Sequence, residues 1–581
     1  MKTSSTPIIL LLVLLGFLST NCKKDKPTPD AGAAILTFSF ISPTDTGIID
    51  IKNHTITITV PDKTTVSSLT STYTLSVGAT VKVGNTPQVS GTTANNFSSS
   101  VTYTVTAEDG TTSQNWNIIV IVGSGINGFI WNGMKNYYLW EENVPNLTNP
   151  KFNTNNSENT DLNTFLNKYT DHEKLFNDLL YQHNVIDKWS WIVDDYTALE
   201  NQFQGITKSP GYDFRLGEFS GTTTLFGFIR YVIKGSPADL AGIKRGDFFL
   251  KVNDQEITEA NYQNLLFNKD SYKLSLATLK NNNVTLSGKT VTVTSAEVHE
   301  NPIYLDTVYT VNNFKIGYLV YNGFMSDYDI QLNNVFGKFK NAGVNKLILD
   351  LRYNGGGSIQ TAVYLASMIY GTSTANVFIK TQYNTAFQAY LKGQFGDSYF
   401  TESFTGTIAK TTTVAEASIN TLGLTDLYII TTGNTASASE IVINGLKPYI
   451  TVKTIGTNTV GKYVGSMTIK DWDNKGNVNP NHKWALQPIT LKIANKDGVS
   501  DYVNGFAPTV LLKEDIANFL PFGDTNEPML HTTLNTVQGI ANKQEQLKSA
   551  GIEFKTIADS KDFQPHSKEM YIEPKFHLKK K

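Results

Sequence analysis

Hydrophobic and polar residues alternate with a period of two over much of residues 34–122. The alternation is clearest in HTITITV, residues 54–60, and in VTYTV, residues 101–105. A period of two is typical of strands that bury one face, and the Asp109-Gly110 pair after the second run is a hairpin signal. We therefore expect residues 34–122 to form a small antiparallel β-sandwich.

The pattern changes after this region. Between residues 123 and 204, hydrophobic residues recur with helical spacing, as in LNTFLNKY (162–169) and HEKLFNDLLYQ (172–182). This spacing predicts a small helical domain with aromatic side chains in its core.

Residues 205–295 return to strands. Within them, GFIRYVIKGSPADLAGIKRGDFFLKV (227–252) predicts a strand, a turn, a short helix, a turn and a second strand.

Strands and helices alternate from residue 296 to residue 540. FKIGYLVYNGF (314–324) is typical of a strand, and DIQLNNVFGKFKNAG (329–343) is typical of a helix that ends at glycine. NKLILDLRYNGGG (345–357) is an apolar strand that runs into a glycine turn. The alternation predicts an α/β domain whose ligands bind at the loops after the strands. We expect residues 541–581 to form a C-terminal helix and a polar tail.

The start of the chain has the pattern of an export signal. Lys2 precedes an apolar run over residues 8–18, which is too short to span a membrane, and LSTNC ends at Cys22. LSTNC resembles the lipobox of bacterial lipoproteins, in which the cysteine is acylated; an incidental cysteine in an ordinary signal peptide is the alternative. The resemblance implies a signal peptide at residues 1–22, a linker at residues 23–33 and a lipid anchor at Cys22. The expected location is the cell envelope, at the outer membrane, facing either the periplasm or the cell surface.

Composition narrows the class of protein. With 581 residues, 40% hydrophobic and 17% charged, the chain is expected to fold into about three to five domains. The net charge of −2 gives no electrostatic reason to expect a nucleic-acid partner. The single cysteine excludes an intramolecular disulfide bond. We expect the protein to be attached to a membrane only by the predicted lipid anchor at Cys22. No later segment has the run of about 18 apolar residues that a transmembrane helix needs.

The first candidate for chemistry is Ser437, in the segment LYIITTGNTASASEIVINGL, residues 427–446. Ser437 and Glu440 fit the S-x-x-E capping box, in which the serine only holds the start of a helix. The alternative is a nucleophile, because the free amides at a helix start suit a developing negative charge. Taken alone, these residues favour the cap.

Two further segments carry candidate chemistry. DLRYNGGG, residues 350–357, places three glycines after a buried strand, so backbone N–H groups can approach a ligand closely. A tight turn is the simpler interpretation, and a phosphate loop is discounted because the lysine of that motif is missing. VGKYVGS, residues 460–466, contains Lys462 directly after a glycine. A lone lysine is more often only a solvated charge.

Together these motifs resemble peptidase family S41, the C-terminal processing proteases. In that family the first serine of S-A-S-E is the nucleophile, and a lysine in a G-K motif is the general base. Here Lys462 follows Ser437 by 25 residues, which is the family's spacing. D-L-R-x-N-x-G-G also matches within residues 350–357, and SPADLAGIKRGD resembles the PDZ domain that precedes the peptidase domain in the family.

The likeness covers about residues 125–540 and implies a multidomain fold. It implies a helical N-terminal domain at residues 123–204, a PDZ domain at residues 205–295 and an α/β peptidase domain of the ClpP/crotonase type at residues 296–540. Residues 34–122 resemble the immunoglobulin-like modules at the front of many Bacteroidetes surface lipoproteins.

The family resemblance implies hydrolysis of protein or peptide substrates by a Ser–Lys dyad. Ser437 would attack the peptide carbonyl, and Lys462 would take the serine proton if burial lowered its pKa from about 10.4 towards about 7–8. Backbone N–H groups would stabilise the oxyanion. The candidates for these donors are Ala438, Gly356 and Gly357.

Other residues would support the dyad. Glu440 would hold the helix start, and Asp350 and Arg352 belong to the matching glycine motif. Ser466 stands four residues after the lysine, where many members of the family carry a glutamine that orients it. A serine reaches less far, so the third catalytic partner is an open question.

A peptide-binding loop is expected in the PDZ region. Gly211, Tyr212, Asp213 and Phe214 fall where PDZ domains hold the carboxylate of a peptide while the peptide adds a strand. Asp213 replaces the small residue usual there, and its charge would disfavour an anionic terminus.

Competing chemistry finds little support. H-E-x-x-H does not occur, and DWDNKG (471–476) resembles a calcium loop but has Lys475 and His482 where carboxylates or other oxygen ligands are needed. We therefore expect no metal and no cofactor. Two other functions remain as alternatives: a catalytically silent peptide-binding lipoprotein, and a glycan-binding or matrix-binding protein that works through residues 34–122.

Overall fold

The computed structural model describes residues 31–44, 46–60, 64–122, 125–152, 160–219, 223–267, 269–280, 283–411, 415–473, 476–540, 554–563 and 567–573. The predicted signal peptide and Cys22 lie outside these residues. The described residues divide into two compact units, one ending at Gly125 and the other beginning at Ile126. Among the described residues, no helix is long and apolar enough to cross a membrane.

The first unit is built from two sheets that share one core. One sheet has the strand order β1-β4-β7 and the other β2-β3-β9-β8-β5-β6. Phe38, Tyr103 and Trp116 are fully buried between them. The strands are β1 (Ile35–Phe40), β2 (Ile48–Asp50), β3 (Thr55–Val60), β4 (Leu69–Leu75), β5 (Thr80–Val83), β6 (Thr86–Pro87), β7 (Ala94–Asn95), β8 (Val101–Thr106) and β9 (Ser113–Val122).

The prediction of a purely antiparallel sandwich is wrong at one pairing, because β3 runs parallel to β9. The period of two could not reveal this, since alternation is the same in both kinds of pairing.

The second unit starts with the helical region. It contains α1 (Gly125–Tyr137), α2 (Pro145–Thr148), α3 (Thr160–Leu166), α4 (His172–Asp178), β10 (Trp191–Val193) and α5 (Tyr196–Phe203). The aromatic side chains of Trp131 and Tyr138 are buried in the main core, as the helical spacing predicts. Strand β10 pairs with β31 (Ala485–Gln487), so this region is joined to the peptidase domain.

The PDZ region contains a sheet with the order β17-β16-β14-β13-β12-β34. Its elements are β12 (Tyr212–Phe219), β13 (Leu225–Val232), α6 (Pro237–Leu240), β14 (Phe248–Val252), β15 (Gln255–Glu256), α7 (Tyr262–Leu266), β16 (Ser271–Lys280) and β17 (Asn283–Thr294), and it is flanked by the pair β11 (Ile206–Ser209) and β18 (Ala296–His299). Ser236 caps α6, with Pro237 in its first turn, which explains the SPADL sequence.

The last strand of this sheet corrects the sequence prediction. Strand β34 (Phe554–Asp559) comes from the end of the chain and pairs with β12. The expectation of a polar tail is therefore wrong for these residues. The alternation in FKTIAD is too short to stand out as a strand without its partner.

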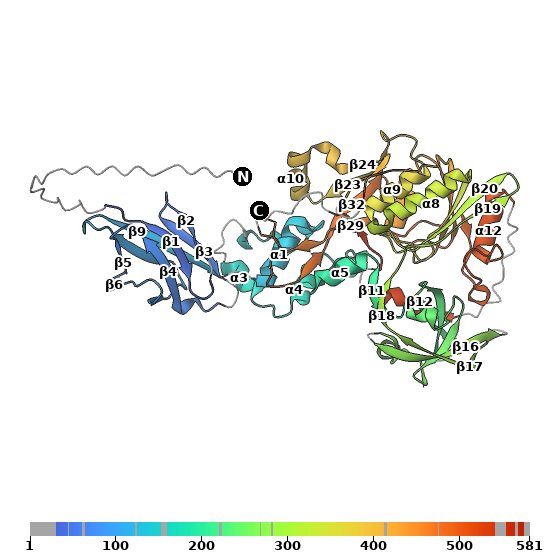
Figure 1. Cartoon of the computed structure of the whole chain (residues 1–581), viewed down its shortest axis with the longest axis horizontal. Coiled ribbons are helices and arrows are strands. Elements are labelled where there is room, and N and C mark those ends of the chain that lie inside the picture. The colour runs from blue at the N-terminus through green and yellow to red at the C-terminus, as the bar shows by residue number, and fades with distance from the viewer. Residues whose placement is uncertain are drawn as a thin grey trace, which may run out of the picture. The chain divides into compact units, whose positions relative to one another are not determined.

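The α/β region predicted at residues 296–540 is built around two six-stranded sheets (Figure 1). The first has the order β19-β20-β21-β27-β28-β33 and is parallel from β20 onward. Alternate residues of β21 point to opposite faces: Leu347 and Leu349 pack with α9 and α11, whereas Ile348 packs with α12. The second sheet has the order β22-β35-β29-β32-β23-β24.

The remaining elements of this domain are as follows. The strands are β19 (Ile303–Val311), β20 (Phe314–Tyr321), β21 (Lys346–Asp350), β22 (Gly357–Ser358), β23 (Val377–Tyr383), β24 (Thr401–Ser403), β25 (Thr407–Ile408), β26 (Ala417–Ser418), β27 (Asp426–Thr431), β28 (Thr451–Gly456), β29 (Val464–Ser466), β30 (Ile469–Lys470), β32 (Ile489–Asn495), β33 (Val510–Leu511) and β35 (Met570–Tyr571). The helices are α8 (Asp329–Asn341), α9 (Ile359–Ile369), α10 (Thr385–Phe395), α11 (Ala438–Leu446) and α12 (Pro528–Val537).

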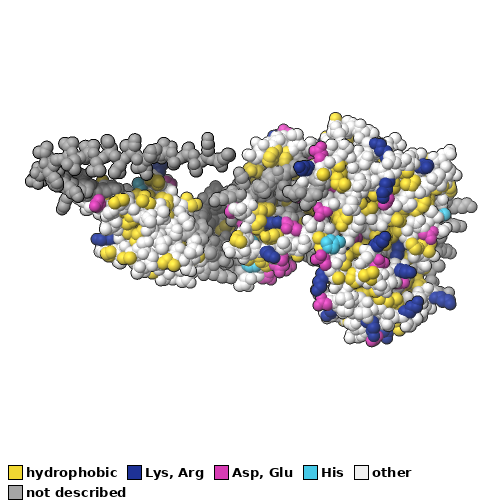
Figure 2. Space-filling view, viewed as in Figure 1, with side chains coloured by type: hydrophobic (Ala, Val, Ile, Leu, Met, Phe, Trp, Pro, Cys, Tyr) yellow, Lys and Arg dark blue, Asp and Glu magenta, His cyan; other side chains and the backbone are white. Residues whose placement is uncertain are grey.

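The charged surface is mixed. On the face shown in Figure 2, lysine and arginine side chains are interspersed with acidic and hydrophobic ones. Among the described residues, no group of three or more His, Cys, Asp or Glu side chains is placed to hold a metal ion.

A buried ion-pair cluster joins the PDZ region to the peptidase domain. Arg352, in the loop after β21, lies 2.8 Å from both Asp350 and Glu527, and 3.2 Å from Glu514. Glu514 also pairs at 3.0 Å with Arg245, from the GIKRGD turn of the PDZ region. Burial alone would raise the pKa of Glu514, but the two guanidinium groups lower it to about 2.

Replacing Arg352 by methionine should lower the free energy of unfolding by about 3–5 kcal/mol, because it leaves three buried carboxylates with too little positive charge. Urea denaturation of the purified protein measures this change. Lys380→Met, at an exposed position of β23, is the matched control. A loss below about 1 kcal/mol for Arg352→Met, which is typical of an exposed ion pair, would contradict this account.

Candidate active site

Ser437 lies where β27 turns into α11. Its φ of 66° is in the left-handed region, which is strained for a residue with a side chain. The side chain is fully buried. Its hydroxyl oxygen has no hydrogen-bond partner in the described part of the chain. The capping box is realised through Glu440, whose carboxylate accepts the Ser437 N–H at 2.8 Å. The Ser437 hydroxyl faces the Glu440 N–H, as in a capping box, but makes no hydrogen bond to it.

Lys462 lies in the loop between β28 and β29, and it too is fully buried. The preceding Gly461 has a φ of 95°, and a Cβ there would lie 2.4 Å from the Val503 carbonyl oxygen. Only glycine allows the chain to turn here, which explains the G-K pair. The interpretation of Lys462 as a solvated charge is wrong.

One carboxylate connects these two loops. Glu440 Oε2 accepts the backbone N–H groups of Ser437, at 2.8 Å, and of Lys462, at 2.9 Å. Its other oxygen accepts the Thr459 hydroxyl at 2.6 Å and the Gly461 N–H at 2.7 Å. Burial raises the pKa of Glu440 to about 7, against the effect of these four donors. The two predicted dyad residues are thus brought together across 25 residues of sequence.

The ammonium group of Lys462 is poorly solvated. Burial lowers its pKa below the ordinary value, while Glu569, Asp187 and Glu440 oppose the shift. Nζ lies 3.4 Å from the Glu569 carboxylate and donates a hydrogen bond of 2.8 Å to the Lys568 carbonyl. It is also 5.1 Å from the centre of the Trp189 ring. Lys462 is therefore engaged by the C-terminal segment.

The glycine loop behaves differently at each position. Gly357 donates its N–H to the Glu569 carbonyl oxygen at 2.6 Å, within the parallel pairing of β22 with β35, and its role in an oxyanion site stays a prediction. Gly356 does not fit that prediction, because its N–H donates to the Asn354 side chain at 2.8 Å. A Cβ on Gly356 would lie 3.0 Å from the Ala438 nitrogen and 2.6 Å from Ser437 Cβ. Ala438, Ser437 and this loop thus converge on one point.

Asp350 and Arg352 lie behind this loop in the buried ion-pair cluster. Their segment is held to the serine loop by hydrogen bonds from Thr435 Oγ1 to the Leu351 carbonyl, 2.8 Å, and from Ser439 Oγ to the Asn354 carbonyl, 3.2 Å. They support the site by fixing the position of the glycines.

Ser466 is in contact with a glutamine side chain from a later strand. Gln487 Nε2 donates to Ser466 Oγ at 2.8 Å, and Thr468 donates to Gln487 Oε1 at 2.8 Å. Ser466 in turn donates to the Glu569 carboxylate at 3.1 Å. Sequence reasoning missed Gln487 because it lies 21 residues further on, in a strand with no motif of its own.

The predicted PDZ loop is partly a strand. Tyr212, Asp213 and Phe214 belong to β12, whereas Gly211 precedes it with a φ of 84°. Asp213 is buried against Arg230 in a close ion pair, so its charge is neutralised. The prediction that Asp213 repels anions is therefore wrong, because the sequence could not show this partner on the neighbouring strand.

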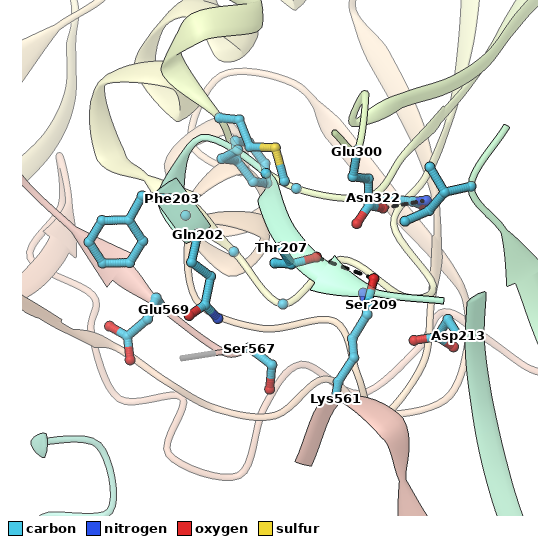
Figure 3. Close-up of a pocket in the computed structure, with 18 of the residues that line it drawn as sticks. Gln202, Phe203, Thr207, Ser209, Asp213, Glu300, Asn322, Lys561, Ser567 and Glu569 are labelled. Carbon is cyan, nitrogen blue, oxygen red and sulfur yellow. Dashed lines mark hydrogen bonds between the residues drawn. The ribbon is translucent and has the colours of Figure 1, made fainter. Parts of the chain in front are cut away.

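A pocket lies between the PDZ region and the peptidase domain. Figure 3 shows Glu569 and Ser567 towards one end and Lys561 and Asp213 towards the other. Its lining includes Gly355, Gly356 and Gly357, and further residues from β11, β13 and the loop after β20. Ser437 and Lys462 are not among the described residues that line this pocket.

Comparison with known families follows the same division of the chain. Residues 315–510 match the model of peptidase family S41, residues 125–191 match the peptidase S41 N-terminal domain, and residues 228–270 match a PDZ domain. Residues 35–120 match a model described as SGBP, N-terminal.

Individual proteins agree with these matches. A Staphylococcus aureus protein named as a CtpA-like serine protease is 27% identical over 284 residues, 48% of this chain and 49% of the relative. The carboxy-terminal processing protease CtpA of Bacillus subtilis is 23% identical over 56% of this chain and 60% of its own. The chain thus spans about half the length of the curated relatives it matches.

A solved structure extends the likeness to the fold. A candidate S41 protease from Bacteroides fragilis is 25% identical, with a TM-score of 0.55, over 71% of this chain and 98% of that one. The three family matches fall in the order predicted from the motifs. The chain thus carries a peptidase S41 N-terminal domain, a PDZ domain and a peptidase family S41 domain.

Proposed function

We propose that the protein is a serine endopeptidase of the C-terminal processing type, which cleaves protein substrates with Ser437 as nucleophile and Lys462 as general base. The observation that supports this proposal most directly is the Glu440 carboxylate, which accepts the backbone N–H groups of Ser437 and Lys462 at 2.8 and 2.9 Å and so holds the two loops together. A buried lysine with a lowered pKa is suited to accept a proton from a serine.

The steps follow from the geometry. Neutral Lys462 takes the proton of Ser437 as the serine oxygen attacks the peptide carbonyl, and then gives it to the leaving amine. The oxyanion is held by the N–H groups of Gly357 and Ala438. Gly357 supports this role, because it already donates to a peptide carbonyl at 2.6 Å. Water then hydrolyses the acyl-enzyme by the same route in reverse.

The PDZ region is proposed to bind the substrate chain beside this site. Its strand β12 has β13 on one side and β34 on the other, so an extended peptide could pair with β12 only in place of β34. Asn434, three residues before the nucleophile, reaches the strand that now pairs with β12, through a hydrogen bond of 2.9 Å to Asp559. Binding at the PDZ edge is thereby linked to the loop that carries Ser437.

One observation favours a second function. Lys462 donates to Lys568 and the Ser437 hydroxyl has no partner in the described residues, so the dyad is not hydrogen-bonded here. A catalytically silent peptide-binding protein would have the same arrangement. Activity separates the two functions.

Ser437→Ala and Lys462→Ala should each lower casein hydrolysis by more than about 1,000-fold, because each removes a member of the dyad. In the wild type, the rate should rise with pH through one ionisation below about 10.4, since Lys462 acts when neutral and burial lowers its pKa. Residues 23–581 would be assayed from pH 6 to pH 10, with fluorophosphonate labelling of Ser437 as a second readout. Hydrolysis that persists in Ser437→Ala, or neither labelling nor hydrolysis by any form, would refute the proposal.

Glu440→Gln should lower both stability and activity. An amide nitrogen would then face the N–H groups of Ser437 and Lys462, and two buried donors without acceptors cost about 2–6 kcal/mol in free energy of unfolding. Urea denaturation and the casein assay measure the two effects. Glu142→Gln, at an exposed position, is the matched control and should change neither. A Glu440→Gln protein with wild-type stability would show that the carboxylate does not hold the two loops.

We also propose that Cys22 carries a lipid that anchors the protein to the cell envelope, at the outer membrane. Its support is the LSTNC sequence, in residues that the structure does not describe. Cys22→Ser should abolish incorporation of labelled palmitate and move the protein from the membrane to the soluble fraction of cells, whereas Ser5→Ala should change neither. Retention of the label in Cys22→Ser would refute the anchor.

A further inference from the structure

The end of the chain adds a strand to the PDZ sheet. Strand β34 pairs antiparallel with β12, from Phe219 opposite Phe554 to Arg215 opposite Asp559. Strand β12 directly follows Gly211, where the sequence predicted a peptide-binding loop. An antiparallel strand on this edge is how PDZ domains take a peptide. The protein's own chain therefore occupies the expected peptide position.

Asp559 ties this strand to charged groups of the PDZ region. Its carboxylate makes a close, two-pronged ion pair with Arg230, which is fully buried, and a second pair with Arg215 at 3.0 Å. It also accepts the Asn434 amide of the nucleophile loop at 2.9 Å. One carboxylate thus contacts both the PDZ sheet and the catalytic loop.

The next residue fills the predicted loop itself. Ser560 Oγ accepts the Phe214 N–H at 3.1 Å and donates to the Asp213 carboxylate at 3.1 Å. The N–H group that would hold a peptide end is therefore occupied by Ser560.

Further along, the chain passes through the glycine loop. A Cβ on Gly355 would lie 1.7 Å from the Ser567 carbonyl oxygen, and one on Gly356 would lie 2.2 Å from the Glu569 carbonyl oxygen. Residues 570 and 571 then form β35, which pairs parallel with β22 and β29. The glycines leave room for a main chain, and that main chain is the protein's own.

The Glu569 carbonyl stands where a substrate carbonyl would have to stand. It accepts the Gly357 N–H at 2.6 Å. The same point beside Gly356 is approached by Glu569 O, Ser437 Cβ and the Ala438 nitrogen, which lie 2.2, 2.6 and 3.0 Å from a Cβ built there. A substrate cannot place its carbonyl at this point while Glu569 is present.

The side chain of Glu569 also acts on the base. Its carboxylate lies 3.4 Å from Lys462 Nζ, accepts Ser466 Oγ at 3.1 Å and accepts the Trp191 ring N–H at 2.9 Å. A carboxylate beside an ammonium group stabilises its charged form, which cannot accept a proton. Ser567 and Glu569 line the pocket, whereas Ser437 is fully buried and does not line it.

We propose that residues 554–563 and 567–573 are a tethered inhibitor, which occupies the polypeptide-binding path from the PDZ edge to Ser437 and must be displaced by the substrate. The proposal rests on the proposed peptidase function. A displacing polypeptide needs an acidic side chain opposite Arg230. Without Asp559, the two arginines Arg215 and Arg230 face only Asp213 in this group of four charges, and one positive charge is left uncompensated.

A recognition site for an external protease, inserted after the exposed Ile540, lets the segment be severed in the folded protein. A segment that belongs to the same chain as its binding site acts at an effective concentration of about 1 mM, so with a Kd of about 10–100 µM it suppresses activity about 10–100-fold. Severing the chain and removing the fragment by gel filtration should raise casein hydrolysis by this factor. A synthetic peptide of residues 554–573 should restore the inhibition, and the same peptide with Asp559→Asn or Glu569→Gln should be at least about tenfold weaker.

The severed fragment could stay bound to the protein during gel filtration. Variants of the intact chain therefore test the same proposal without removing the fragment. Asp559→Asn combined with Glu569→Gln should raise hydrolysis about tenfold or more, whereas Asp497→Asn, at an exposed position, should not. Unchanged hydrolysis in both the severed protein and the double variant would overturn the proposal.

Binding separates this proposal from the peptidase function. In a Ser437→Ala background, fluorescence anisotropy of the labelled 554–573 peptide on the severed protein needs no catalysis. If the peptide binds tightly but the protein that keeps Ser437 hydrolyses nothing, the proposed peptidase function is wrong and the proposed tethered inhibitor is supported. Hydrolysis that is unaffected by removal of the segment, with no peptide binding, would reject the segment and leave the peptidase standing.

Discussion

The buried carboxylate of Glu440 is the constraint on which the site depends. It sits at the first turn of α11 and accepts four donors from two loops, so neither loop can move without leaving a buried N–H or O–H group unpaired. The strained φ of 66° at Ser437 is held by the same contact. A residue that the local sequence presents as part of a helix cap therefore fixes the loops of Ser437 and Lys462 relative to each other.

The sheet beneath this carboxylate explains why the loops meet. Strands β21, β27 and β28 are parallel neighbours, and the glycine loop, the serine loop and the lysine loop follow their carboxyl ends in turn. The strands are buried on both faces, which fixes their order and register. Glu440 and the ion pairs of Arg352 then act at the edge of a rigid layer, so a few hydrogen bonds are enough to position the side chains.

Local sequence patterns predicted the order of the domains, the helices with buried aromatic side chains and the strand-loop-helix segments of the site, because these depend on spacing within a short stretch. They failed where the partner lies far away in sequence. Asp213 looks like an anion-repelling residue until Arg230, on the adjacent strand, is seen to neutralise it. In the sequence, Ser466 replaces the glutamine that many members of the family carry. In the structure, the side chain of Gln487 donates a hydrogen bond to it. The tail looked polar because a strand of six residues shows little alternation, and its hydrogen-bond partners lie on β12. Gly356 differs for a local reason, since Asn354 captures its N–H.

The pairing of β12 with β34 also bears on how the protein is made. Arg215 and Asp559 are 344 residues apart in sequence. A chain that emerges from the ribosome at about 5–20 residues per second presents β12 for about 17–70 s before β34 exists. Throughout that interval the nascent PDZ sheet has an open edge, which is a site for unintended strand pairing. The edge of the PDZ sheet is thus covered by a strand that is synthesised long after β12, and not by a neighbouring hairpin.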